Sequence, residues 1–164
     1  MHRRSVAVFD RFLSALATIL EKTEAHCEAK KFKPEVILAA RLFPDMFPLV
    51  KQVQLACDFS TRCTARLAGV EPKSFPDTET TFAELKDRIS AARGYMGSFQ
   101  AQDFAQSADR EVHFKAGGRD MMLKGEEFLS FYALPQFFFH VTTAYDILRA
   151  NGVELGKRDY MGAP

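Results

Sequence analysis

The chain has 164 residues and a formal net charge of +1, with 22 Lys and Arg residues against 21 Asp and Glu residues. That balance excludes the broad basic field of a nucleic-acid-binding surface, and 47% hydrophobic with 26% charged residues is typical of a globular chain. No apolar run approaches the ~18 residues of a membrane-spanning helix, and Asp10 interrupts the first apolar stretch too early for a secretory signal. We therefore expect a cytoplasmic protein of one domain, residues 1–164, with neither a nucleic-acid nor a membrane partner.

The first part of the chain has apolar residues at spacings of three and four, the pattern of a helix with one buried face. The stripe from Val6 to Leu20 predicts a helix over about residues 3–30. Pro34 and Pro44 bracket a short apolar piece that predicts a connecting turn of helix.

Two further helices are predicted in the middle of the chain. One starts near Asp45, tolerates Pro48 in its first turn and ends at Gly69. After a surface connection, Thr81 and Glu84 form a capping-box pattern in front of a new apolar stripe, which predicts the third long helix.

A strand signal follows the third helix. Taking Gly117-Gly118 as a two-residue turn gives two strands in which both charged pairs have opposite signs. The pairs are Glu111 with Lys124, Val112 with Leu123, Phe114 with Met121 and Lys115 with Asp120. One side of this hairpin is apolar, so we expect it to pack on the helices or on a second subunit.

A fourth long helix is predicted from Gly125 to Arg149. Pro135 lies inside it and should kink it, unless the helix begins there. The predicted fold class is all-α, a four-helix bundle with a small β-hairpin between the third and fourth helices.

Polar residues on core-facing stripes are the candidates for a binding site, because bundles build their sites from inward side chains of facing helices. On the fourth helix, Gln136, His140 and Thr143 lie along one line. An inward His140 needs hydrogen-bond partners or a metal, and an ordinary hydrogen-bonded core histidine is one reading. On the second helix, Gln52 and Gln54 either supply one amide to the bundle axis or both lie at the rim.

Other residues give weaker signals. Tyr145 offers a hydroxyl to the same cavity or forms a core wall with its tip in water. Cys27, Cys57 and Cys63 lack the spacing of a metal site. The chain has no GxSxG, HExxH, P-loop or GxGxxG pattern, so no motif supports a hydrolase, a kinase or a dehydrogenase.

Four stretches carry a family resemblance: residues 41–49 (RLFPDMFPL), 52–54 (QVQ), 134–145 (LPQFFFHVTTAY) and 147–153. With them, nearly the whole chain resembles the DinB-like, or YfiT-like, superfamily of bacterial four-helix proteins. More closely it resembles an uncharacterised branch, a domain family of unknown function. The resemblance implies helices connected up, down, down, up, often paired into homodimers.

Typical relatives hold a divalent metal with three histidines, one from the second helix and two from an HxxxH pattern on the last, and some are thiol-dependent transferases. The resemblance aligns His140 with the second histidine of that pattern, Gln136 with the first, and Gln52 or Gln54 with the ligand from the second helix. Amides are weak ligands for zinc or nickel, so His140 is the metal-ligand candidate and no complete site is expected.

These observations favour a homodimeric, non-catalytic protein that binds a small molecule or has a stress or accessory role, with no cofactor. Its polar pocket would be lined by Gln52, Gln54, Gln136, His140, Thr143 and Tyr145. The alternative is a divalent-metal-dependent, thiol-linked transferase or hydrolase in which His140 helps to hold a weakly bound zinc or nickel ion. In a third reading, the hairpin and the phenylalanine-rich fourth helix serve only dimer or partner contact.

Overall fold

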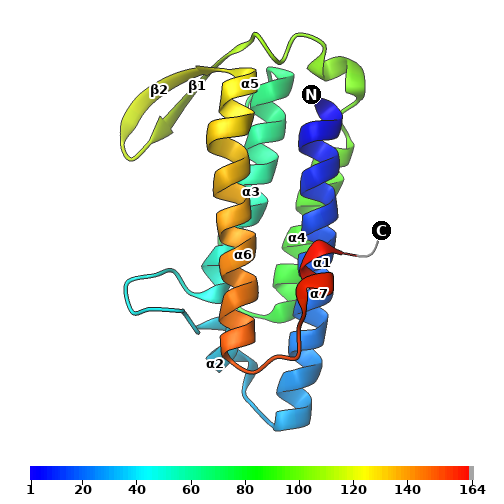
Figure 1. Ribbon diagram of the computed structural model, residues 1–164, viewed down its shortest axis with the longest axis vertical. Helices are drawn as coiled ribbons and strands as arrows, with labels where there is room; N and C mark the ends of the chain where they lie inside the picture. The colour runs from blue at the N-terminus through cyan, green and yellow to red at the C-terminus, as the bar shows by residue number, and fades with distance from the viewer. Residues whose placement is uncertain (163–164) are drawn as a thin grey trace.

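Four long helices form the body of the molecule, which the computed structural model describes over residues 1–162 (Figure 1). Each helix buries one apolar stripe, as Phe9, Leu13 and Leu16 of the first helix illustrate. The four are α1 (His2–Lys30), α3 (Leu49–Ala68), α4 (Phe82–Gly97) and α6 (Leu134–Ala150).

The directions of the helices follow the predicted order. In Figure 1, α1 and α6 run one way and α3 and α4 the other. The ion pairs agree, because Arg93 of α4 meets Asp10 of α1 whereas the earlier Lys86 meets the later Glu24. Residues 69–81 therefore run back along the bundle to join two parallel helices. The predicted all-α bundle with its up-down-down-up connection is confirmed.

The start of α3 corrects a prediction. The helix begins at Leu49 and not near Asp45, and Pro48 is the extended residue that precedes it. A proline disfavours helical backbone at the residue before it, so the helix does not continue back through Phe47. Residues 39–48 form a loop instead, in front of which lies the short α2 (Pro34–Leu38).

The last helix changes type before its proline. α5 (Gly125–Glu127) leads into a π-helical segment, η2 (Phe128–Ala133), and then into α6, whose second residue is Pro135. Proline has no N–H to donate, and the wider π turns alter the hydrogen-bond register just before it. The ribbon runs on without the predicted kink, and α6 begins at Leu134, close to the alternative start at Pro135 (Figure 1).

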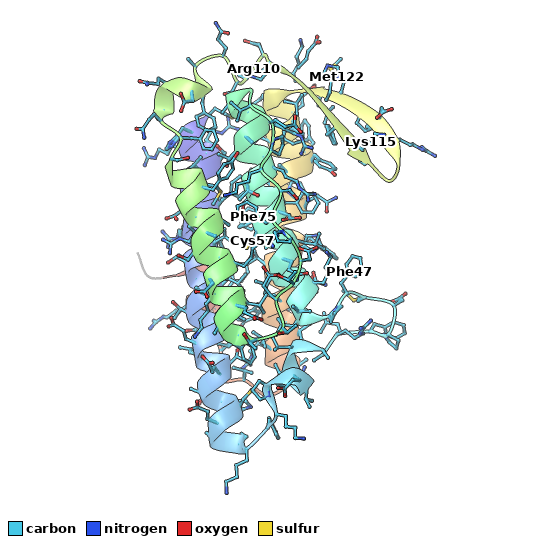
Figure 2. The ribbon with its side chains drawn as sticks, turned by 180° about the vertical axis from the view of Figure 1, so that it is seen from behind. Phe47, Cys57, Phe75, Arg110, Lys115 and Met122 are labelled. Atoms are coloured by element: carbon cyan, nitrogen blue, oxygen red, sulfur yellow. The ribbon has the colours of Figure 1, made fainter. Side chains whose placement is uncertain are left out.

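The hairpin, β1 (Glu111–Ala116) and β2 (Arg119–Lys124), has the predicted register. Phe114 packs on Phe128 and Tyr132, with ring centroids 5.0 and 4.5 Å away, so this part of the apolar side covers η2. Met121, which was expected on the same covered side, is 41% exposed. The far part of the hairpin, which carries Lys115 and Met122, extends beyond the helices (Figure 2).

Smaller elements complete the chain. A 3-10 turn, η1 (Ala101–Phe104), follows α4, and the short α7 (Lys157–Met161) lies against α1 near the end of the described chain (Figure 1). The capping box at α4 is present as predicted, with Glu84 N donating to Thr81 Oγ1 at 3.2 Å. Within residues 1–162, no helix is both long enough and apolar enough to cross a membrane.

Candidate functional site

His140 lies at the contact between α3 and α6, nearly enclosed, with 6% of its surface exposed. Its Nδ1 is 2.8 Å from Oε1 of Gln52, a residue of the facing helix 88 positions earlier. Antiparallel packing of α3 on α6 brings the two together, because each is on the stripe that faces the other helix. One glutamine and the histidine therefore meet across the bundle.

The geometry fixes which ring nitrogen carries the proton. Gln52 Nε2 donates to the backbone oxygen of Phe47 at 3.1 Å, so the amide turns its carbonyl oxygen toward the histidine. A carbonyl oxygen can only accept, so His140 Nδ1 must be the N–H donor. The other nitrogen, Nε2, is then an unprotonated acceptor.

Aromatic rings surround the imidazole. Phe59 of α3 stacks on it with centroids 5.4 Å apart and planes 14° from parallel, and Phe139 meets it edge-on at 5.3 Å. Burial, and to a smaller extent the positive charge of Lys51, together lower the pKa of His140 to about 4. The ring is therefore neutral at pH 7.

The Nε2 atom of His140 has no hydrogen-bond partner within residues 1–162. Within residues 1–162, the buried side-chain nitrogens and oxygens without a hydrogen-bond partner are Nε of Arg88 and Nε of Arg110. His140 Nε2 also has no partner, and it is not among these fully buried atoms, so it keeps a small exposure to solvent. A ligand that reaches it would meet a lone pair beside two phenyl rings.

The other residues expected in this pocket lie elsewhere or act locally. Gln54 is two positions from Gln52, which is about 200° around a helix, and it donates to Glu79 at 2.8 Å on the side facing α4. The expectation that Gln54 lines the His140 pocket is therefore corrected. Tyr145 packs edge-on against Tyr160 of α7, at 5.7 Å, and not on the imidazole.

Two predicted residues stay near His140 in the chain without joining its hydrogen bonds. Thr143 Oγ1 donates back to the carbonyl oxygen of Phe139 at 2.7 Å, as threonines inside helices commonly do. Gln136 is half-buried one turn before His140. The structure thus brings together Gln52 and His140, with Phe59 as a wall. Phe59 is seven positions after Gln52, on the same helix face, so this spacing was available in the sequence.

Sequence reasoning also missed a charged cluster on the other side of α3. Arg88 of α4 is 4% exposed, and its guanidinium contacts Asp58 at 2.6 Å and Glu79 at 3.0 Å. It also donates to the carbonyl oxygen of Pro76 at 2.8 Å. Burial pulls the pKa of Arg88 down, but the carboxylates outweigh it, so this pKa lies above its usual value. Arg88 follows Leu85 by three positions, a core-facing spacing that could have marked it.

The donor set at His140 does not fit a zinc or nickel ion. Such ions take several imidazole, thiolate or carboxylate ligands, and here one imidazole is accompanied by the single amide of Gln52. No group of three or more His, Cys, Asp or Glu side chains in the described part of the chain is arranged to hold a metal.

Comparison with known proteins gives a family and no activity. Residues 1–161 match the family model described as Domain of unknown function (DUF1993). A crystal structure of a DinB family member protein from Shewanella denitrificans is similar, with a TM-score of 0.94 and 41% sequence identity over 99% of this chain and 92% of that chain. No curated protein matches.

Proposed function

From the premise that this chain belongs to the DUF1993 family of DinB-like proteins, we propose that it is a non-catalytic binding protein. Its site is the His140 pocket, and its ligand is a small molecule with an O–H or N–H donor on an apolar or aromatic body. The observation that carries the proposal is the 2.8 Å contact between His140 Nδ1 and Gln52 Oε1. This contact holds the acceptor Nε2 in one orientation beside Phe59.

The chemistry at the site favours binding over catalysis. An imidazole with a pKa of about 4 is a weak base at pH 7, so it accepts a hydrogen bond without taking the proton away. Stacking on Phe59 and the bond to Gln52 restrict the ring, so a ligand loses little free energy in ordering it.

The experiment follows the ring nitrogens of His140 by two-bond ¹H–¹⁵N correlation NMR at pH 7. The Nδ1–H tautomer is expected, and phenol is expected to shift the Nε2 resonance in a saturable way, whereas anisole, which lacks the O–H, shifts it less. An Nε2–H tautomer, or equal shifts with the two probes, contradicts the proposal. His113→Gln is the matched control, because His113 is exposed on the hairpin.

The metal-dependent transferase or hydrolase is tested on the same protein. Purified chain is titrated with zinc and nickel, and bound metal is measured after dialysis. Stoichiometric metal that is lost in His140→Gln but kept in His113→Gln would replace the binding proposal by the metal-dependent one. Weak binding that is unchanged by His140→Gln supports the present proposal.

The predicted homodimer is part of the proposal, and exposed apolar side chains support it. Phe131 and Phe139, eight positions apart on η2 and α6, are 77% and 55% exposed. The loop with Phe47 and the hairpin with Met122, both exposed, extend from the same side in Figure 2. Monomers rarely leave so much apolar surface in water.

Light scattering after gel filtration tests the dimer. The chain is expected to run as a dimer and Phe131→Ser/Phe139→Ser as a monomer. Phe32→Ser/Val36→Ser, which changes two exposed apolar residues around α2, is expected to leave the dimer intact. A monomeric parent chain, or a dimer that survives the first pair of substitutions, contradicts this interface.

A further inference from the structure

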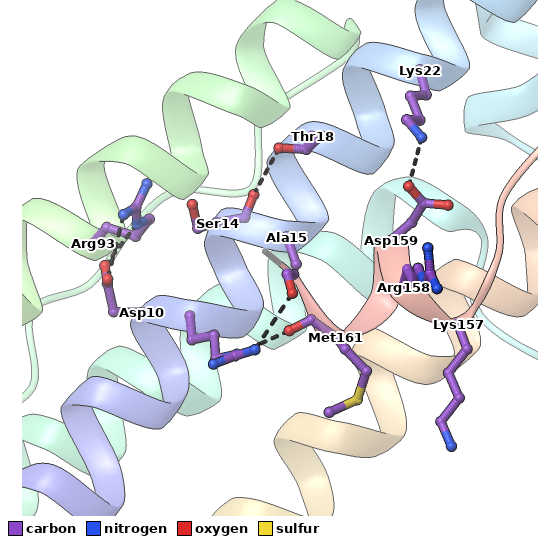
Figure 3. A pocket seen from close by; sticks show the side chains of 12 residues that line it. Asp10, Ser14, Ala15, Thr18, Lys22, Arg93, Lys157, Arg158, Asp159 and Met161 are labelled. Carbon is purple, nitrogen blue, oxygen red and sulfur yellow. Dashed lines mark hydrogen bonds and ion pairs between the residues drawn. The ribbon is translucent and has the colours of Figure 1, made fainter. Parts of the chain in front are cut away.

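A groove beside α1, away from His140, has a volume of about 1090 Å³. It lies between the middle of α1, the short α7 and Arg93 of α4 (Figure 3). Neither His140 nor any other residue of the proposed pocket lines it. The groove is therefore a separate candidate site.

The groove carries a larger positive charge than the chain as a whole. Five cationic side chains line it against two carboxylates, a formal excess of three positive charges, whereas the full chain has a net charge of +1. The cations are Arg11, Lys22, Arg93, Lys157 and Arg158, and the carboxylates are Asp10 and Asp159. A concentration of one charge sign in a concave surface raises the local concentration of the opposite ion.

Both carboxylates are already engaged. Asp10 accepts from Arg93 at 2.7 Å, and Asp159 accepts from Lys22 at 2.6 Å (Figure 3). The carboxylates of Asp10 and Asp159 therefore do not neutralise the remaining cations of the groove. Among the ion pairs of residues 1–162, none includes Lys157.

Arg158, next to it, is likewise outside the ion pairs of the described chain, and both side chains are exposed on the rim. They are also not needed to hold α7 in place. Arg11 Nε donates to the carbonyl oxygen of Met161 at 2.9 Å, and Tyr160 packs on Phe12 at 5.4 Å. Arg11 and Lys22 anchor α7, and Arg93 joins α4 to α1, but neither role explains Lys157 and Arg158.

The floor of the groove is less polar than its rim. Ala15 is buried there, Met161 contributes an exposed thioether, and the hydroxyls of Ser14 and Thr18 lie alongside on α1. An apolar floor below a cationic rim suits a molecule with an apolar body and one negatively charged group. Guanidinium and ammonium groups pair with carboxylate, sulfonate and phosphate oxygens alike.

We propose that this groove binds a small organic anion with an apolar body, held by Lys157 and Arg158 over Ala15. The proposal is independent of the His140 pocket, so His140→Gln leaves this binding unchanged. Salt weakens the binding, because the rim cations are exposed and screened.

The test uses 1-anilinonaphthalene-8-sulfonate as the probe and N-phenyl-1-naphthylamine as its uncharged analogue, followed by fluorescence titration. Lys157→Glu/Arg158→Glu is expected to weaken the anionic probe about tenfold or more and to leave the neutral analogue unchanged, since only charge at the rim is reversed. The matched control is Lys30→Glu/Lys33→Glu, which makes the same change in net charge at two exposed positions, the last residue of α1 and the loop after it.

Backbone amide NMR locates the probe. Shifts are expected at Ala15, Thr18 and Met161, and are expected to disappear in the groove variant. Equal weakening in the groove variant and in the control, or shifts confined to Phe131 and Phe139, overturns the proposal. Absence of saturable binding of the anionic probe overturns it as well.

Discussion

Replacing Arg88 by methionine should destabilise the protein far more than any surface substitution of the same kind. The guanidinium is 2% exposed, and its partners Asp58 and Glu79 have side chains that are 8% and 10% exposed. Methionine fills most of the volume but leaves two nearly buried carboxylates without their cation. Breaking a buried ion pair in this way costs about 3–5 kcal/mol.

The structure places the expected value near the lower end of that range. After the substitution, Asp58 keeps its contact with Arg62 at 2.7 Å, and Glu79 keeps the amide of Gln54 at 2.8 Å. Each carboxylate thus retains one donor, and we expect the free energy of unfolding to fall by about 3 kcal/mol. Urea denaturation followed by circular dichroism measures it.

Lys86→Met is the matched control, on the same helix. Lys86 also contacts a carboxylate, Glu24, at 2.8 Å, but the two side chains are 29% and 40% exposed, so about 0–1 kcal/mol is expected. Arg88 also holds the carbonyl oxygen of Pro76, so trypsin should cut after Lys73 faster in Arg88→Met. Equal destabilisation by the two substitutions would refute the conclusion that the buried cluster of Arg88, Asp58 and Glu79 stabilises the fold.

Four further substitutions test separate features. The imidazole of His140 takes up a proton near its ordinary pKa of 6.5 in the unfolded chain, but only near a pKa of about 4 in the folded protein. The free energy of unfolding should therefore be highest above pH 6.5 and fall by about 3 kcal/mol as the pH is lowered to 4. Urea titrations at several pH values should show this dependence, and His140→Gln should remove it. Gly125→Ala places a methyl group 1.8 Å from the backbone oxygen of Ser107 and should lower the melting temperature strongly, whereas Gly94→Ala, with open space around it, should raise stability by about 0.5–1 kcal/mol. Thr81→Ala should lower the free energy of unfolding by about 1 kcal/mol, measured in urea, because the cap at α4 is lost.

Local sequence patterns correctly predicted the structural features that depend on residues close together in the chain. The register of the hairpin follows from Gly117-Gly118 and the charged pairs beside it, and the start of α4 follows from Thr81 and Glu84. α7 was not predicted, because five mostly polar residues show no periodicity. It is held by tertiary contacts such as that of Tyr160 Oη with Thr142 Oγ1, at 2.9 Å.

The candidate site was only partly predictable for a related reason. Spacing along α6 marked His140, and the position of two glutamines beside the apolar stripe of α3 marked Gln52 and Gln54. The choice between Gln52 and Gln54 depends on which helix packs on which side of α3, and that is a property of the whole bundle. Two polar residues on opposite sides of one helix give the same sequence signal, so the sequence does not show which neighbouring helix each of them contacts.

The two sides of α3 also differ in what they leave open for function. On the side of α4, Asp58 and Glu79 are each matched by donors, and burying further charge there would disturb a balanced cluster. On the side of α6, Gln52 satisfies one nitrogen of His140 and leaves the other as an accessible acceptor. A ligand adds a hydrogen bond at His140 without displacing one, whereas at Arg88 the unpaired Nε is fully buried and the other nitrogens are held by carboxylates. Binding is therefore expected on the neutral side of the helix, and substitutions on the charged side should act through stability alone.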